Sequence, residues 1–195
     1  PLYNSLDTLK LALGGFSKGG GGAQLAASVG QNIKAIIALY PWLENISSSD
    51  LNHNVPVLIV SGSLDIIAPP SLHADVHYMY TPQTTNKLKY ELAFGTHDPL
   101  TGPNAGSGEV GKKTLSWLQT FLLSDTCFCP YLLDTPNNAS IYMSNLNCTE
   151  IGTNTNNLQS NTEKKLVKII DVFGREVSPK KNMILFYVYD NQSVK

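Results

Sequence analysis

Ser17 and the glycines around it are the residues of this chain whose types and spacing most clearly suit a chemical reaction. Ser17 is the centre of a G-x-S-x-G run from Gly15 to Gly19. Between a strand and a helix, such a run forms a nucleophile elbow, a tight turn that strains the serine backbone and presents the hydroxyl above a sheet. We expect glycine two residues to either side because no side chain would fit there. The chemistry would be attack of the hydroxyl on a carbonyl carbon.

A serine hydroxyl needs a base, and the base needs an orienting carboxylate. Asp65 follows one expected strand, and His97 follows the next strand along the chain. Both would project from the carboxyl edge of a parallel sheet, the same edge as Ser17. A glycine-rich turn, a helix-capping aspartate and an exposed loop histidine are the separate alternatives. The order Ser, Asp, His, which is that of α/β-hydrolases, favours a catalytic triad over coincidence.

The remaining histidines are weaker candidates. His73 and His77 are four residues apart on an expected helix, a spacing that could suit a metal, but no H-E-x-x-H run accompanies them. We therefore predict that they lie on a solvated helix face. His53 lies in an Asn-rich loop, and we expect it to be exposed.

The elements that must position these residues follow from the hydrophobic pattern. Apolar or β-branched runs predict strands, and amphipathic or proline-initiated stretches predict helices. The predicted strands span 9–13, 33–40, 57–62 and 89–92, and the predicted helices begin at 20 and span 70–80 and 109–123. Strands that alternate with helices predict an α/β fold, with a parallel sheet covered by helices on both faces.

Composition limits the class of protein. The chain has 195 residues, a net charge of −1 and 15% charged residues, so no strong field points to nucleic acid or an anionic membrane. No apolar run is long enough for a membrane span. Cys127, Cys129 and Cys148 favour one disulfide and an oxidising compartment over a zinc site, for which further ligands are missing. Cys129 and Cys148 could form this disulfide, which would leave Cys127 as a free thiol.

The composition changes towards the end of the chain. We predict a catalytic domain over 1–148, an Asn/Thr-rich linker over 149–162 and a partial β-rich tail over 163–195. Within the tail, 166–173 and 183–189 are predicted strands. Two strands alone are rarely stable, so the tail is expected to be incomplete.

Four motifs together resemble bacterial cutinases and poly(ethylene terephthalate) hydrolases, over about residues 9–148. They are the elbow, the run Leu39-Tyr40-Pro41-Trp42, the run Asp65-Ile66-Ile67-Ala68-Pro69 and the run Gly95-Thr96-His97. The resemblance implies an α/β-hydrolase fold, of which this chain would hold the C-terminal half of the parallel sheet with its flanking helices. Residues 165–195 resemble a type IX secretion sorting domain, which implies a Bacteroidota source and an extracellular enzyme, either released or attached to the cell surface.

The resemblance also assigns roles. It implies Ser17 as nucleophile, His97 as base and Asp65 as its orienting partner. The backbone N–H of Lys18 would contribute to the oxyanion hole. Trp42 would form an aromatic wall beside the scissile ester, and Ile67 would contact the acyl part. The pair Cys129–Cys148 resembles the C-terminal disulfide of the family.

Two departures from the family pattern stand out. Members usually carry Met after the nucleophile, where this chain has Lys18. Its ammonium could assist an anionic transition state, disfavour protonated His97, or extend into solvent. The second departure is that the segment before the elbow strand, which would supply the second oxyanion donor, is expected to be missing.

The favoured function is therefore a secreted serine carboxylic-ester hydrolase that acts on polyesters or short-chain esters through an acyl-enzyme. It would need no metal or organic cofactor, and we expect a monomer whose partners are its ester substrate and, through the tail, the type IX machinery. Two alternatives stay open: a serine peptidase of the prolyl-oligopeptidase type, and a non-catalytic secreted protein that binds polymer through a hydrolase scaffold.

Overall fold

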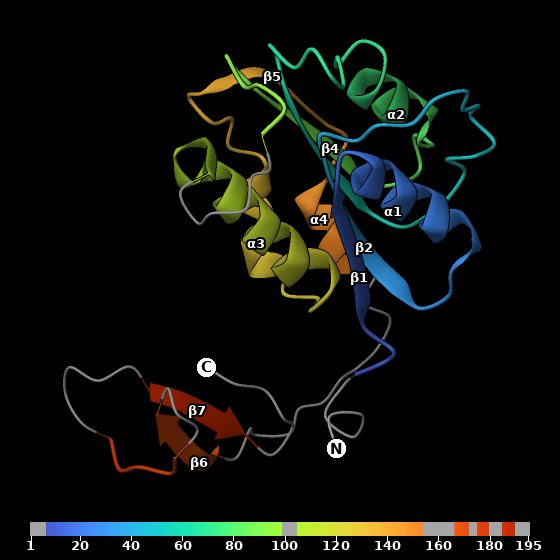
Figure 1. Cartoon of the computed structure of the whole chain (residues 1–195). Helices are drawn as coiled ribbons and strands as arrows, with labels where there is room; N and C mark the ends of the chain where they lie inside the picture. The colour runs from blue at the N-terminus through green and yellow to red at the C-terminus, as the bar shows by residue number, and fades with distance from the viewer. Residues whose placement is uncertain (1–6, 99–104, 154–165, 172–174, 180–184, 190–195) are drawn as a thin grey trace. The chain divides into compact units, whose positions relative to one another are not determined.

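A computed structural model describes residues 7–98, 105–153, 166–171, 175–179 and 185–189. The chain divides into two compact units, Pro1–Asn154 and Thr155–Lys195. Five strands in the first unit form one mixed sheet in the order β1-β2-β3-β4-β5 (Figure 1). Their bounds are β1 Leu11–Phe16, β2 Ile33–Leu39, β3 Val57–Gly62, β4 Lys87–Leu92 and β5 Ala139–Ser144.

Four of these strands, β1 to β4, are parallel, as predicted, because the connections between them return the chain each time to the same end of the sheet. The fifth, β5, pairs antiparallel with β4 and was not anticipated from the sequence. β5 is a half-exposed edge strand, so it lacks the continuous apolar run that identifies β2 and β3. The observed sheet is therefore mixed, with its parallel part as expected.

Helices cover both faces of the sheet (Figure 1). The helices of the first unit are α1 Lys18–Val29, α2 Ala74–Tyr80, α3 Glu109–Phe121 and α4 Cys148–Thr153, together with the 3-10 segments η2 Ala105–Gly108 and η3 Thr126–Leu132. Ala23 and Ala27 of α1 and Ala74 of α2 share one apolar cluster with the strands. Val110 and Trp117 of α3 belong to the cluster on the other face. The expected layering of helices on both faces is confirmed.

Several boundaries differ from the predicted ones. The elbow strand ends at Phe16 rather than at residue 13, so it runs directly into the serine. The helix predicted from Pro70 begins at Ala74, because Pro70 lies in a preceding turn. The predicted linker over 149–162 starts inside α4, and its residues from 154 onward lie outside the described part of the chain.

Buried charge anchors α2 to the sheet. Lys89 on β4 is fully buried and forms ion pairs with Asp75 of α2 and with Glu91. Such a pair is costly to break, because one partner would remain as an uncompensated buried charge. This contact fixes the helix that follows the Asp65 loop.

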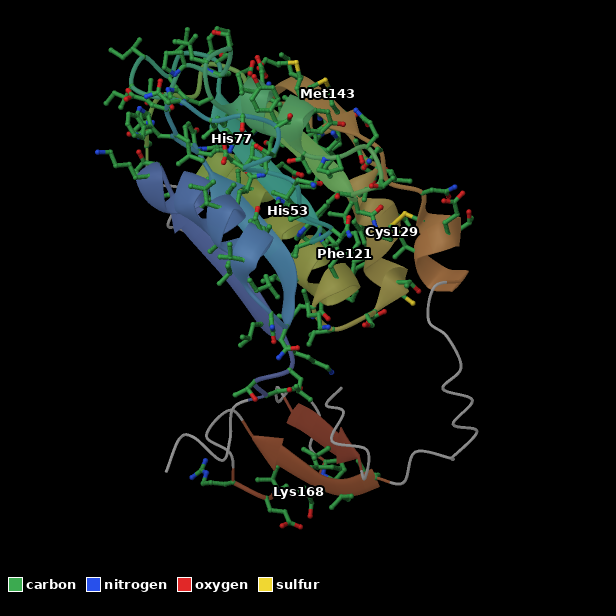
Figure 2. The ribbon with its side chains drawn as sticks, turned by 90° about the vertical axis from the view of Figure 1, so that its right-hand side faces the viewer. His53, His77, Phe121, Cys129, Met143 and Lys168 are labelled. Atoms are coloured by element: carbon green, nitrogen blue, oxygen red, sulfur yellow. A yellow bond between two sulfur atoms is a disulfide. The ribbon has the colours of Figure 1, made fainter. Side chains whose placement is uncertain are left out.

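The predicted disulfide is present. Cys129 in η3 (labelled in Figure 2) is joined to Cys148 at the start of α4. Cys127 is an exposed free thiol. Among the described residues, no helix is both long and apolar enough to cross a membrane.

In the second unit, β6 Leu166–Asp171 pairs antiparallel with β7 Leu185–Tyr189. The last two residues of the predicted strand over 166–173 and the first two residues of the predicted strand over 183–189 lie outside the described residues. The predicted identity of this unit as a sorting domain stays a prediction.

Candidate active site

Ser17 stands alone between β1 and α1. Its backbone has φ of 54° and ψ of −121°, a conformation that costs free energy for a residue with a side chain. Four backbone hydrogen bonds hold it: Ser17 donates to the Leu39 carbonyl at 2.9 Å, and its own carbonyl accepts from Gly20, Gly21 and Trp42 at 3.0 to 3.1 Å. The surrounding backbone thus maintains the strained conformation.

The glycines around Ser17 have unequal roles. A Cβ on Gly15 would lie 2.2 Å from the Gly19 carbonyl oxygen, so no side chain fits there. A Cβ on Gly19 would meet nothing within 4 Å, which makes the expectation of a tight fit on both sides wrong. The second tight position is Gly20, whose Cβ would lie 2.9 Å from the carbonyl oxygens of Gly15 and Leu39.

The structure brings Ser17, His97 and Asp65 into one hydrogen-bonded chain. Ser17 Oγ lies 3.0 Å from His97 Nε2, and His97 Nδ1 lies 2.6 Å from Asp65 Oδ2. With the proton on Nδ1, the imidazole donates to the carboxylate and accepts from the serine hydroxyl. All three residues follow parallel strands at the carboxyl edge of the sheet: β1, β3 and β4.

Asp65 uses its two carboxylate oxygens differently. Oδ2 faces His97, and Oδ1 accepts from the backbone N–H groups of Ile67 at 2.9 Å and Ala68 at 2.8 Å. The side chain is fully buried. The helix-capping alternative is wrong, because these N–H groups belong to the loop before α2, which begins at Ala74. The loop bonds and the contact with His97 occupy different oxygens of the carboxylate.

The loops that carry Asp65 and His97 are joined through their backbones. Leu64 donates to the Gly95 carbonyl at 2.8 Å, and Ser63 donates to the Leu92 carbonyl at 3.0 Å. A Cβ on Gly62 would lie 2.4 Å from the Gly95 oxygen, so the close approach requires glycine there. This contact sets the separation of the acid and the base.

Two aromatic residues to which the sequence analysis gave no role enclose the imidazole. The Phe16 ring centroid lies 4.8 Å from that of His97, and the Tyr40 ring meets it edge-on at 5.8 Å. Burial, reinforced by the negative charge of Asp65, raises the pKa of Tyr40 to about 12, so its phenol stays neutral. The signal in the sequence was their place in two of the motifs, Phe16 in the elbow and Tyr40 directly after β2 in the run Leu39-Tyr40-Pro41-Trp42.

Trp42 is fixed next to the serine by backbone and ring contacts. Its backbone N–H donates to the Ser17 carbonyl at 3.0 Å, and its indole stacks on the ring of His73 with ring centroids 5.7 Å apart. The Lys18 ammonium lies 4.8 Å from the centre of the same indole. The backbone N–H of Lys18 belongs to the first turn of α1, where helical N–H groups lack intrahelical acceptors.

The loops at this edge of the sheet expose apolar side chains. Ile67, the expected acyl contact, is 60% exposed. It belongs to a wider set of exposed apolar residues in the segments after β3 and β4: Leu64, Ile66, Ile67, Leu72 and Phe94. An accumulation of exposed apolar groups is typical of a binding surface.

The predictions for the other histidines are wrong. His73 and His77 are buried rather than solvated, and His53 is buried rather than exposed (Figure 2). His73 contacts Trp42, and His77 hydrogen-bonds Gln24 of α1 through Nδ1. Among the described residues, no three potential metal-binding side chains gather at one place.

Comparison with known proteins gives one family. The model of the PET hydrolase-like family matches residues 1–149. The chain is 38% identical to "Cutinase est1" of Thermobifida alba over 133 residues, 68% of this chain and 43% of that protein. It is 37% identical to a cutinase of Thermobifida fusca over 67% of this chain and 42% of that protein. It is 34% identical to "Bis(hydroxyethyl) terephthalate hydrolase" of Streptomyces coelicolor over 67% of this chain and 41% of that protein. The chain thus spans less than half the length of these relatives.

Proposed function

The chain belongs to the PET hydrolase-like family, and from that premise we propose that it is a serine carboxylic-ester hydrolase of the cutinase type. The observation that carries the proposal is the hydrogen-bonded chain from Ser17 through His97 to Asp65. These contacts have the geometry that nucleophilic catalysis requires, a nucleophile in reach of a base that is itself oriented by a third group.

In the proposed mechanism, Ser17 Oγ attacks the ester carbonyl and its proton passes to His97 Nε2. Collapse of the tetrahedral intermediate breaks the bond to the alcohol oxygen, which takes that proton and leaves. Water then gives a proton to His97 and attacks the acyl-enzyme, which releases the acid and restores the serine. Asp65 stabilises the imidazolium in both halves, and the Lys18 backbone N–H donates to the oxyanion.

We propose polyesters and short-chain esters as substrates. The names of the relatives support this class, because they are cutinases and a hydrolase of bis(hydroxyethyl) terephthalate. In this chain, Trp42 would support the acyl part beside Ser17, and the exposed Ile67 would contact it. The exposed apolar side chains around the Asp65 and His97 loops suit an extended apolar chain better than a small polar substrate.

We further propose that the protein is extracellular, with a catalytic domain that includes α4, a second domain over 163–195, and a linker between them. The disulfide Cys129–Cys148 supports an oxidising compartment. The proposed role of the last domain is that of a type IX sorting signal, whose removal should leave the enzyme inside a cell that uses this secretion route.

The test is labelling of the full-length protein with a fluorophosphonate, followed by peptide mass spectrometry. We expect a stoichiometric adduct on Ser17 that is absent from Ser17→Ala and retained in Ser48→Ala, an exposed serine outside the site. Hydrolysis of 4-nitrophenyl butyrate should disappear with the adduct. A folded protein without an adduct would contradict the proposal, and faster cleavage of peptide anilides than of esters would favour the peptidase alternative.

A further inference from the structure

Lys18 places an exposed positive charge next to the proposed nucleophile. Its ammonium lies over the indole of Trp42, 4.8 Å from the ring centre. None of the ion pairs found within residues 7–98 and 105–153 includes Lys18. Its charge is therefore available to a negatively charged group on a bound molecule.

The position of this lysine does not favour the helix that it begins. Lys18 is the first residue of α1, and the first turn contains no acidic residue. A cation at a helix N-terminus opposes the helix dipole, so the charge destabilises α1 rather than stabilising it. Local choices that oppose the fold are most common at functional sites.

Backbone and ring contacts fix where the ammonium lies. The backbone N–H of Trp42 donates to the Ser17 carbonyl, and the indole ring stacks on His73. The cation–π contact then keeps the exposed Lys18 side chain on the indole of Trp42, the residue whose backbone is bound to that of Ser17. An acyl group supported by Trp42 would bring its far end close to this ammonium.

We propose that Lys18 is a specificity-determining residue that favours esters whose acyl part carries a free carboxylate, that is, half-esters of dicarboxylic acids. The proposal rests on the proposed function, because it requires ester cleavage at Ser17. Hydrolysis of one ester bond of a dicarboxylic diester by water leaves such a half-ester and an alcohol. Lys18 would thus favour cleavage of the second ester bond, which releases the free diacid.

The experiment compares monomethyl terephthalate, which is anionic, with neutral dimethyl terephthalate, using the full-length protein. The readout is the ratio of kcat/KM for the anionic ester to that for the neutral ester, so that intrinsic reactivities cancel between variants. Lys18→Met removes the charge at similar size, and Lys18→Arg keeps it. Lys34→Met is the matched control, since Lys34 is exposed near the start of β2, at the opposite end of the parallel sheet from Ser17.

We expect Lys18→Met to lower the ratio by about two- to fivefold, the range of a solvent-exposed ion pair. Lys18→Arg and Lys34→Met should retain the wild-type ratio, and added salt should lower it in the wild type but not in Lys18→Met. An unchanged ratio in Lys18→Met, with both esters still cleaved, would overturn this inference and leave the proposed function intact. Absence of cleavage of both esters together with absence of a Ser17 adduct would instead contradict the proposed function.

Discussion

Asp65 combines a structural and a proposed catalytic role in one side chain. Its Oδ1 accepts two backbone N–H groups of its own loop, and its Oδ2 accepts from His97. The loop bonds fix the carboxylate, so the imidazole meets an acceptor that does not need to reorganise during the reaction. A substitution that keeps one acceptor oxygen and removes the other can therefore distinguish the structural role from the catalytic one.

We expect Asp65→Asn to lower kcat by about 10³- to 10⁴-fold while the protein stays folded. An amide oxygen can still accept from Ile67 and Ala68, but its NH₂ group cannot accept from His97 Nδ1. Asp65→Ala should lose comparable activity and also reduce the free energy of unfolding by about 2 kcal/mol, because the loop N–H groups lose their acceptor. Ester hydrolysis and urea unfolding measure the two effects, and equal stability of the two variants would contradict the structural role.

Sequence reasoning placed Ser17, Asp65 and His97 at the same sheet edge because each follows a recognisable strand. The structure brings the three side chains into hydrogen-bond contact, and their catalytic roles stay predictions. The same reasoning was wrong for His73 and His77, which are buried. A helical spacing shows that two residues share a face, but it does not show whether another element covers that face.

At the scale of the elements, the turn from β1 into α1 depends on one glycine of the motif, Gly15, and on one glycine outside it, Gly20. Gly15 and Gly20 lie against backbone oxygens, while Gly19 has open space around the position of a Cβ. The end of β1 therefore lies very close to the start of α1, and Gly20 also packs on the Leu39 carbonyl at the end of β2. Only the three-dimensional path of the chain distinguishes these positions.

We expect opposite effects from two neighbouring substitutions. Gly19→Ala should raise the free energy of unfolding by about 0.5–1 kcal/mol, because alanine favours the helix and restricts the unfolded chain. Gly20→Ala should destabilise the protein by about 2 kcal/mol or more and abolish labelling of Ser17, because its Cβ would meet backbone that cannot move independently. Thermal unfolding and fluorophosphonate labelling measure both, with Gly22→Ala, another open position, as the control.

The contact between α1 and α2 contains a buried histidine. Nδ1 of His77 hydrogen-bonds the side-chain oxygen of Gln24, whose nitrogen donates to Thr81 Oγ1 at 3.3 Å. Burial, with a smaller contribution from His73, lowers the pKa of His77 from 6.5 to about 4. The folded protein therefore holds this imidazole neutral at pH values where the unfolded chain would protonate it.

This shift predicts a loss of stability in mild acid. Above pH 6.5 both states are neutral at His77, and as the pH falls from 6.5 to about 4 only the unfolded state takes up the proton. The free energy of unfolding should fall by about 3 kcal/mol over this window. His77→Asn, which keeps a donor towards Gln24, should be about 1 kcal/mol less stable at pH 7.5 but should have a smaller pH dependence. The free energy of unfolding of both proteins is measured in urea at each pH. Curves of equal slope for the wild type and His77→Asn would contradict the assignment of the pH dependence to His77.

His53 should also contribute to the pH dependence of the free energy of unfolding. Its pKa is also lowered by burial, which outweighs an opposing contribution from the Val55 backbone. A residual pH dependence should therefore remain in His77→Asn and diminish further in the double variant with His53→Asn.

The long-range pairing of elements was less predictable than the elements themselves. β2 and β3 are nearly continuous apolar runs, which identifies them as interior strands of a parallel sheet. β5 follows two 3-10 segments and α3, and it pairs with β4 in the opposite direction. Its half-exposed side chains give only a weak alternating pattern, so local sequence does not identify its partner.

At the scale of the whole molecule, all described residues of the proposed site and the disulfide lie in the unit Pro1–Asn154. Composition placed the end of the catalytic domain at residue 148, but the chain continues into α4. The side chain of Asn147 caps this helix by accepting from the N–H of Thr149 at 3.2 Å. A polar segment can therefore belong to the fold when a cap and a cross-link hold it.

The disulfide closes a loop that contains β5. Cys129 and Cys148 are 19 residues apart, and the strand Ala139–Ser144 lies between them. By the chain-entropy argument, a loop of this length stabilises the folded state by about 3 kcal/mol. The cross-link therefore restricts the part of the chain that must pair antiparallel with β4, the strand that leads to His97.

We expect the double variant Cys129→Ser/Cys148→Ser to lower Tm by about 10 °C, which corresponds to that loss for a unit of this size. Reduction of the wild type should produce the same shift, whereas Cys127→Ser, which removes only the exposed free thiol, should leave Tm unchanged. Because β4 and the His97 loop are also held by the parallel strand β3, labelling of Ser17 at 25 °C should survive in the double variant. Loss of labelling below the unfolding transition would instead show that the cross-linked edge strand helps to position the base, so that stability and site geometry depend on the same covalent bond.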